Sequence, residues 1–198
     1  MEATELNRPS DAPFTNDEFN KNYGSLGHWL WTDIRIPKEL KELVKVNKPK
    51  TSLELGCGLG RFSTYMAKQG IQATAVDFSS VAIEKAKRRV ANDEQQAKFL
   101  VGDVTNLEML NEQFDMSFDV GCFHCLNTDG QIKYVNEIYR LLKNGATHTI
   151  WAMDKSPSNM TFTPEFVAKI FDTKFELVKA KFSRRRIIAS HWYWLTKK

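Results

Sequence analysis

Acidic side chains and a glycine-rich segment mark the part of the sequence that could bind a small molecule. The stretch TSLELGCGLGRFSTYMAKQG (51–70) is an apolar run, then three glycines at alternate positions, then a helix-like run. Such a loop lets backbone N–H groups approach a ligand at the N-terminus of the following helix. Glu54 lies two residues before the first glycine, Gly56. A carboxylate at this position would repel the pyrophosphate of a dinucleotide and would suit a cationic ligand.

Two further acids close the next two predicted strands. Asp77 ends the strand 72–77, where a carboxylate accepts hydrogen bonds from ribose hydroxyls. Asp103 ends the strand 98–103 and is placed to accept from an adenine amino group. S-adenosylmethionine carries a sulfonium, an ammonium and a carboxylate, but no phosphate. The three acids therefore favour S-adenosylmethionine over a dinucleotide.

Apolar periodicity predicts strands and helices that alternate along the chain. Strands are expected at 51–56, 72–77, 98–103, 114–123 and 146–154, and helices at 36–46, 61–68, 81–93, 132–145 and 164–171. Ser79 or Ser80 is expected to cap the third helix, and Asn144-Gly145 to end the fourth. The last two strands, 174–182 and 186–196, are joined by a tight connection around SRRR and must be antiparallel. The pattern indicates a Rossmann-like α/β fold, a doubly wound and mostly parallel sheet with one reversed strand.

Length and composition predict a single globular domain. The chain has 198 residues, 42% of them hydrophobic and 26% charged. The N-terminal residues are polar, no long apolar run is present, and the three cysteines fit a reducing compartment. We therefore expect a cytoplasmic protein without a membrane segment, acting as a monomer or homodimer. Residues 1–35 are expected to form an arm and lid, and residues 36–198 the catalytic domain.

The segment from Leu53 to Asp154 resembles the class I S-adenosylmethionine-dependent methyltransferases. The pieces that carry the resemblance are LELGCGLGRF, AVDFSSVAIEKAK, FLVGDV, FDVGCFHCL and YRLLKNGATHTI, in this order. The resemblance implies seven strands in the order 3-2-1-4-5-7-6, with the seventh antiparallel. It also implies a set of cofactor-binding residues: Glu54, Gly56, Cys57, Gly58, Gly60, Arg61, Asp77, Phe78, Gly102, Asp103, Val104, Gly121 and Cys122. The short length, the Trp-rich N-terminal part and GCFHCL resemble the small-molecule thiol, thiopurine and tellurite methyltransferases.

Other residues are candidates for the acceptor side of the site. His124 follows the fourth strand and could act as a general base, or it could pack or cap the next helix. The two cysteines of CFHC could also form a redox pair, while zinc would need a second ligand cluster that the sequence lacks. No metal is expected. The remaining candidate acceptor-binding residues are Trp29, Trp31, Phe123, Asp154, Arg184, Arg185 and Arg186, although the arginines could equally form a solvated turn and the tryptophans could pack against the sheet.

The residues predict in-line methyl transfer to a small-molecule acceptor, such as a thiol or a related soft nucleophile. An alternative is a nucleic-acid methyltransferase, because Lys174–Lys198 carries a charge of +7 within a chain of net charge +4. Enzymes that methylate a base nitrogen resemble one another in an Asp/Asn-Pro-Pro-Tyr motif, but residues 121–124 read GCFH here. Nucleic acid is therefore not expected as a partner. A catalytically silent cofactor-binding protein is the third hypothesis.

Overall fold

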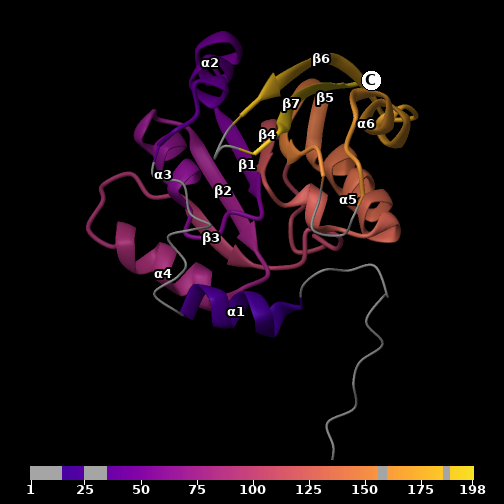
Figure 1. Cartoon of the computed structure of the whole chain (residues 1–198). Helices are drawn as coiled ribbons and strands as arrows, with labels where there is room; N and C mark the ends of the chain where they lie inside the picture. Colours follow the sequence, from indigo (N-terminus) through magenta and orange to yellow (C-terminus); the bar gives the residue numbers. More distant parts are fainter. Residues whose placement is uncertain (1–14, 25–34, 156–159, 185–187) are drawn as a thin grey trace, which may run out of the picture.

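A seven-stranded sheet forms the centre of the computed structural model, which describes residues 15–24, 35–155, 160–184 and 188–198 (Figure 1). Its strands are β1 (Thr51–Leu55), β2 (Gln72–Asp77), β3 (Lys98–Val101), β4 (Phe114–Val120), β5 (Leu142–Met153), β6 (Phe175–Ser183) and β7 (Ser190–Lys197). Its helices are α1 (Asn16–Gly24), α2 (Lys38–Asn47), α3 (Arg61–Lys68), α4 (Ser80–Val90), α5 (Thr128–Leu141) and α6 (Pro164–Phe171), with a short 3₁₀ helix η2 (Phe123–Cys125). None of the helices in these ranges is long and apolar enough to cross a membrane.

The strand order is β3-β2-β1-β4-β5-β7-β6, which confirms the expected topology. Neighbouring strands from β3 to β5 are parallel, and β7 is antiparallel to both β5 and β6. The carboxyl ends of the five parallel strands therefore meet at one edge of the sheet. Ligands of doubly wound sheets bind at this edge, near the point where the strand order reverses.

Helices cover both faces of the sheet, so the central strands are buried on two sides, whereas the edge strand β6 is largely exposed. The apolar faces of α2, α3 and α4 pack on one face, together with Phe118, Trp151 and Trp192. Those of α5 and α6 pack on the other face, with Ile150 and Tyr193. Trp192 and Tyr193 are both buried although they are consecutive, because side chains alternate between the two faces of a strand.

Several strand boundaries differ from the prediction, most clearly those next to Gly145 and Gly121. Helix α5 ends at Leu141, so Asn144-Gly145 lies inside β5 and does not end the helix. The register between β4 and β5 shifts in this region, and Gly145 takes the positive φ that the irregularity needs. Strand β4 ends at Val120 because Gly121 has a φ of 101° and turns the chain away from the sheet.

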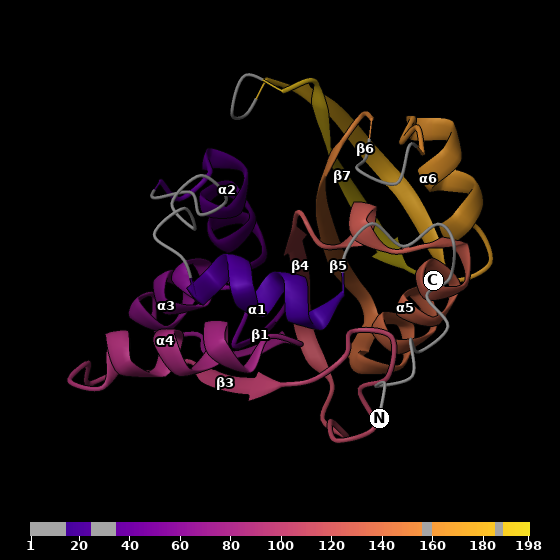
Figure 2. The same cartoon turned by 60° about the horizontal axis from the view of Figure 1, so that its bottom comes forward.

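Helix α1 was not predicted, since residues 19–35 show no regular apolar period. The structure places α1 alongside α4, as Figures 1 and 2 both show. The capping residue of α4 is Ser79, whose hydroxyl accepts a hydrogen bond from the Ala82 amide at 3.1 Å. Strand β7 begins at Ser190, so the connection from β6 is longer than the predicted four-residue turn.

Candidate methyl donor site

The loop between β1 and α3 can be formed only with glycines at its key positions. Gly56 and Gly60 have φ values of 67° and 63°, in the left-handed region that other residues rarely adopt. A Cβ on Gly56 would lie 2.4 Å from the Cβ of Cys122, and one on Gly60 would lie 2.1 Å from the ring of Phe99. The glycines thus let the loop pass close to the segment after β4, with its amides at the carboxyl edge.

Glu54 is buried beneath this loop and binds the start of α3. Its exposed fraction is 2%, and its Oε2 accepts hydrogen bonds from the Ser63 amide at 2.8 Å and from the Ser63 hydroxyl. Burial raises the pKa of the Glu54 carboxyl to about 8. These contacts give Glu54 a role in positioning the glycine loop. Direct contact between Glu54 and the cofactor stays a prediction.

Asp77 joins the glycine loop to the start of α4. Its Oδ2 accepts a hydrogen bond from the Gly58 amide at 2.7 Å, and its Oδ1 accepts one from the Ser79 amide at 2.9 Å. Burial raises the pKa of the Asp77 carboxyl, and the two backbone hydrogen bonds oppose the change. A carboxylate oxygen can accept more than one hydrogen bond, so each oxygen retains capacity for a ligand hydroxyl.

Asp103 and Val104 follow β3 on the expected adenine side. Asp103 is exposed, and its Oδ1 accepts from the Thr105 amide and hydroxyl, both at 2.8 Å. Val104 is buried in the core. Gly102 donates from its amide to the Asp77 carbonyl at 3.0 Å, which joins the ends of β2 and β3.

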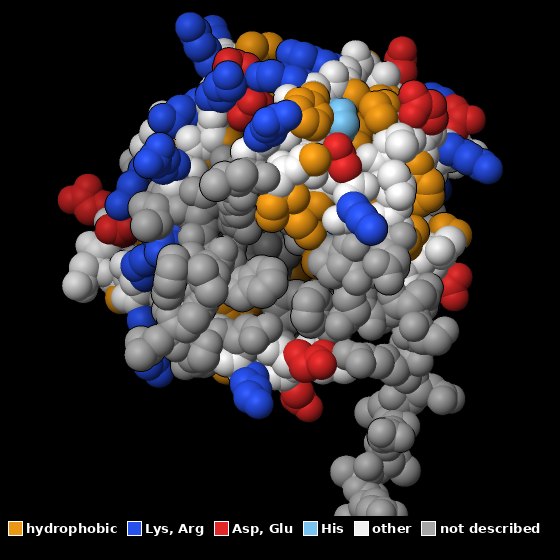
Figure 3. Space-filling view, in the orientation of Figure 1, with side chains coloured by type: hydrophobic (Ala, Val, Ile, Leu, Met, Phe, Trp, Pro, Cys, Tyr) orange, Lys and Arg blue, Asp and Glu red, His pale blue; other side chains and the backbone are white. Residues whose placement is uncertain are grey.

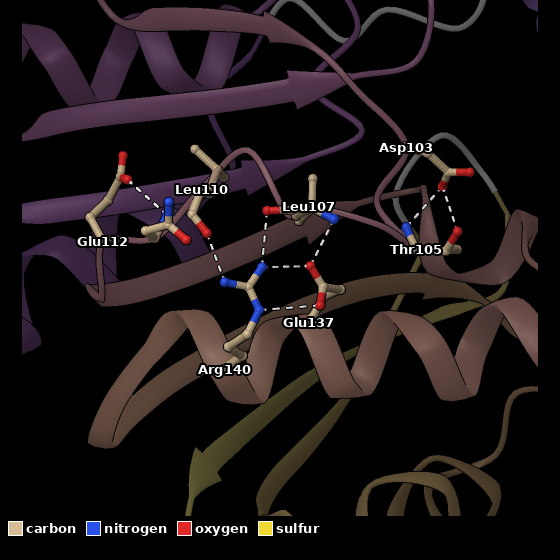
Figure 4. Close-up of polar contacts among 8 residues, drawn as sticks. Asp103, Thr105, Leu107, Leu110, Glu112, Glu137 and Arg140 are labelled. Carbon is tan, nitrogen blue, oxygen red and sulfur yellow. Dashed lines mark hydrogen bonds and ion pairs between the residues drawn. The ribbon is translucent and has the colours of Figure 1, made fainter.

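Two side chains of α5 hold the segment that follows Asp103 (Figure 4). Arg140 donates to the carbonyls of Leu110 at 2.7 Å and Leu107 at 2.9 Å. Glu137 accepts from the Leu107 amide at 2.7 Å and also pairs with Arg140. The conformation of this segment is therefore determined by α5, which is remote in sequence.

Asp119 organises the turn after β4. Its two oxygens accept from the amides of Cys122 at 2.7 Å and Phe123 at 2.6 Å, and Tyr134 donates to it at 3.0 Å. The Tyr134 hydroxyl also lies 3.2 Å from Nε2 of His148, so the polar network continues into the core. Burial raises the pKa of Asp119 to about 6. Asp119 was not predicted as a site residue, although an acid at the end of a buried strand was an available signal.

His124 lies in the buried layer beside this turn. Its exposed fraction is 3%, and its ring packs edge-on against Trp151 and Phe162. Its Nδ1 lies 3.4 Å from the amide of Met153, which can donate to it. Phe123 is fully buried, in ring contact with Tyr134 and other aromatic side chains. A contact between either residue and the acceptor stays a prediction.

Tyr23 of α1 is a second residue, after Asp119, that sequence reasoning missed. Its hydroxyl would lie 2.6 Å from a Cβ on Gly58, so its ring covers the glycine loop. Burial, and next the charge of Asp77, raise the pKa of the Tyr23 phenol. Helix α1 is attached to α4 by a hydrogen bond from the Ser79 hydroxyl to Asn20 at 2.6 Å and by one from Lys85 to the Tyr23 carbonyl.

Of the predicted acceptor-side residues, the structure describes Asp154 and Arg184 besides Phe123. Asp154 follows β5 and lies 2.6 Å from Nδ1 of His191. Arg184 is exposed after β6, with its guanidinium 6.0 Å from the centre of the Phe182 ring. Trp29, Trp31, Arg185 and Arg186 lie outside the described residues, and their predicted roles are not tested.

Residues 53–145 match the model of a methyltransferase domain family. A methyltransferase domain therefore lies within residues 53–145, and the strand order of the sheet agrees with this match. The match to a methyltransferase domain supports S-adenosylmethionine as its cofactor. Four further residues were predicted to bind the cofactor. Cys57 is buried, and Arg61, Phe78 and Cys122 are partly buried.

Similar proteins include small-molecule methyltransferases. The methyltransferase domain is 29% identical over 124 residues to norajmaline N-methyltransferase of Rauvolfia serpentina, covering 60% of this chain and 42% of that enzyme. It is 32% identical over 134 residues to demethylmenaquinone methyltransferase of Leptospira interrogans, covering 65% of this chain and 52% of that enzyme. The chain thus spans about half the length of these curated relatives.

A solved structure shows the same fold over the whole chain. It is 1,6-didemethyltoxoflavin-N1-methyltransferase of Burkholderia thailandensis, with a TM-score of 0.79 and 20% identity, covering 100% of this chain and 93% of that one. That protein was solved with 1,6-didemethyltoxoflavin and S-adenosylhomocysteine bound.

Proposed function

We propose that this methyltransferase domain transfers the methyl group of S-adenosylmethionine to a small-molecule acceptor. The observation that carries the proposal is the position of Asp77, whose carboxylate is held at the carboxyl edge by the Gly58 and Ser79 amides. A carboxylate that is already bound by two backbone amides is preorganised to accept from the ribose hydroxyls. It faces the loop whose glycines allow close approach of a ligand.

Each end of the cofactor has a candidate set of residues. The glycine loop would bind the methionine end, with Glu54 positioning the loop and contributing negative charge when it is ionised. Asp77 would bind the ribose, and Asp103 with Val104 would bind the adenine. The other predicted residues complete the lining: Gly56, Cys57, Gly58, Gly60, Arg61, Phe78, Gly102, Gly121 and Cys122. Tyr23 joins this set because its hydroxyl lies against Gly58.

The turn after β4 would border the transferred methyl group. The sulfonium is an activated electrophile, so the domain needs mainly to hold a nucleophile in line with the carbon–sulfur bond, about 3 Å from the methyl carbon. A thiol would need little activation, because part of it is ionised at neutral pH. An N-methyltransferase relative and an N1-methyltransferase with the same fold support a nitrogen acceptor equally well.

The proposal is tested with S-adenosylhomocysteine binding by calorimetry and with a panel of acceptors and methyl-labelled cofactor. Benzylamine, benzimidazole, phenol and thiophenol represent the amine, heterocycle, hydroxyl and thiol classes. We expect cofactor binding, no comparable binding of NAD, and label transfer to at least one probe. Cofactor binding without transfer to any probe, combined with labelling of tRNA or of a protein substrate, would refute a small-molecule acceptor.

A further inference from the structure

A histidine and a carboxylate form a close pair at the carboxyl edge of the sheet. Nδ1 of His191 lies 2.6 Å from Oδ1 of Asp154. The two residues are 37 positions apart in sequence, and the antiparallel pairing of β7 with β5 brings them together, with His191 opposite Ala152. Their side chains are 20% and 29% exposed, so the pair is accessible from solvent.

The pair is linked to the turn that borders the proposed methyl position. The amide of Phe162 donates to the Asp154 carbonyl at 2.9 Å, and the Tyr193 hydroxyl donates to the Phe162 carbonyl at 2.8 Å. The Phe162 ring in turn packs 6.4 Å from the ring of His124, which belongs to the turn after β4. Phe162 thus lies between the turn and the His191–Asp154 pair.

The surface around the pair is suited to an apolar acceptor. Figure 3 shows a histidine surface beside an acidic side chain and among hydrophobic ones. The other described histidines, His124 and His148, are 3% and 0% exposed. His191 also stacks on Tyr193 at 5.8 Å and meets Phe182 edge-on at 5.4 Å between ring centres. Its imidazole is therefore held in one orientation by two aromatic rings and a carboxylate.

Building on the proposed methyl transfer, we propose that His191, oriented by Asp154, removes the proton from a weakly acidic N–H or O–H group of the acceptor. A carboxylate accepts from Nδ1–H, which leaves the lone pair of the imidazole on Nε2. Among the residues that the structure describes, no hydrogen bond to Nε2 of His191 is found. His191 is thus the catalytic residue, and Asp154 is a positioning residue that fixes the tautomer.

The proposed step balances without a further reactant. The acceptor X–H bond breaks as Nε2 of His191 takes the proton, and the electron pair on X forms the bond to the methyl carbon. The carbon–sulfur bond breaks, and its electron pair stays on sulfur, giving neutral S-adenosylhomocysteine. The imidazolium then releases the proton to water.

Charged groups face His191 from two neighbouring elements. Asp154 faces it from β5 and Glu165 from α6, while Tyr193 lies beside it on β7. Arg184 follows β6, and its guanidinium and the His191 ring both lie against the Phe182 ring. His124 is less suited to the task, since it is buried and its Nδ1 faces the backbone of β5.

The first test compares phenol, whose O–H has a pKa of about 10 and needs a base, with thiophenol, which is ionised at about pH 8. We expect His191→Gln to lower kcat for phenol by about 100-fold and for thiophenol by less than about threefold. The pH–rate profile with phenol should lose its acidic limb in this variant, and S-adenosylhomocysteine affinity should stay within about twofold of wild type. Asp154→Asn should lower kcat for phenol in the same direction, whereas Asp172→Asn at the opposite end of the sheet should not. Equal losses with both probes, or no loss with either, would overturn the proposal, as would a profile that His124→Gln flattens and His191→Gln does not.

The second test does not need an acceptor. Long-range ¹H–¹⁵N spectra of the histidine-labelled protein with S-adenosylhomocysteine should show the His191 proton on Nδ1 at about pH 8, and Asp154→Asn should remove this preference. A proton on Nε2 would overturn the proposal. If the wild type binds cofactor but methylates neither probe, the proposed function fails for these acceptors, and the spectra still decide whether the pair exists.

Discussion

Replacing Asp77 with asparagine should remove most of the affinity for the cofactor. The carboxylate binds the Gly58 amide at 2.7 Å through one oxygen and the Ser79 amide at 2.9 Å through the other. Asparagine has a single acceptor oxygen, so its NH₂ group would face one of these two N–H donors. The variant therefore both loses a charged acceptor for the ribose and disturbs the glycine loop.

The size of the loss in cofactor affinity follows from the number of hydrogen bonds that depend on the charge of Asp77. A hydrogen bond to a charged group contributes about 1.5–3 kcal/mol, so losing one or two of them costs binding about 2–4 kcal/mol. This corresponds to about 30-fold to 1000-fold weaker binding of S-adenosylhomocysteine. Calorimetry measures it directly, with Asp172→Asn as a matched control because that side chain is 80% exposed at the end of α6. Asp77→Glu, which keeps the charge, separates loss of the acceptor from a failure to fold.

The pH dependence of binding gives an independent check. Burial raises the pKa of the Asp77 carboxyl in the free protein, and ribose hydroxyls donate only to its ionised form effectively. Cofactor affinity should therefore increase as the pH rises through the titration of Asp77 and should lose this increase in Asp77→Asn. An Asp77→Asn protein that binds within about twofold of wild type, at all pH values, would refute the assignment of Asp77 to the ribose.

The other predictions concern the glycines, the buried Glu54, the contacts of Arg140 and the exposed Arg184. Gly60→Ala should lower the free energy of unfolding by about 2–4 kcal/mol, because the new Cβ would combine a left-handed φ with a contact of 2.1 Å. Gly70 also has a positive φ, 80°, but a Cβ added there would meet no atom within 4 Å. Urea denaturation of Gly70→Ala should therefore show only the cost of the left-handed backbone, about 1–2 kcal/mol. Burial raises the pKa of Glu54 from 4.5 to about 8, so its contribution to stability is complete below pH 4.5 and is lost as the pH rises to 8; Glu54→Gln should remove this part of the decline in urea-unfolding free energy. Arg140→Met should speed hydrogen exchange in residues 103–110 by about tenfold and weaken cofactor binding, while equal exchange rates would contradict the role given to α5. Arg184→Ser should raise KM for an anionic acceptor such as a carboxylated thiophenol more than for thiophenol, and equal responses would indicate a solvated turn.

The sequence by itself determined the order of the strands and predicted the donor side of the site. Buried parallel strands read as short apolar runs, and each acid at the end of such a run lies at the same edge of the sheet. Asp77 and the glycine loop could therefore be placed at this edge without coordinates. Local signals also located Thr163 as the start of α6, where its hydroxyl accepts from the Phe166 amide. Local signals gave the wrong end for α5, because the pairing of β5 with β4 overrides the preference of Asn144-Gly145 for a helix end.

Only the tertiary structure decided which residues from distant parts of the chain meet at the edge. Tyr23 reaches Gly58 because α1 packs on α4, and no apolar period in the sequence indicates that packing. His191 meets Asp154 because β7 runs antiparallel to β5 with one particular register, and a shift of one residue would turn His191 to the opposite face. Local patterns specify how a segment folds, whereas the register and packing of segments far apart in sequence determine which side chains share a site.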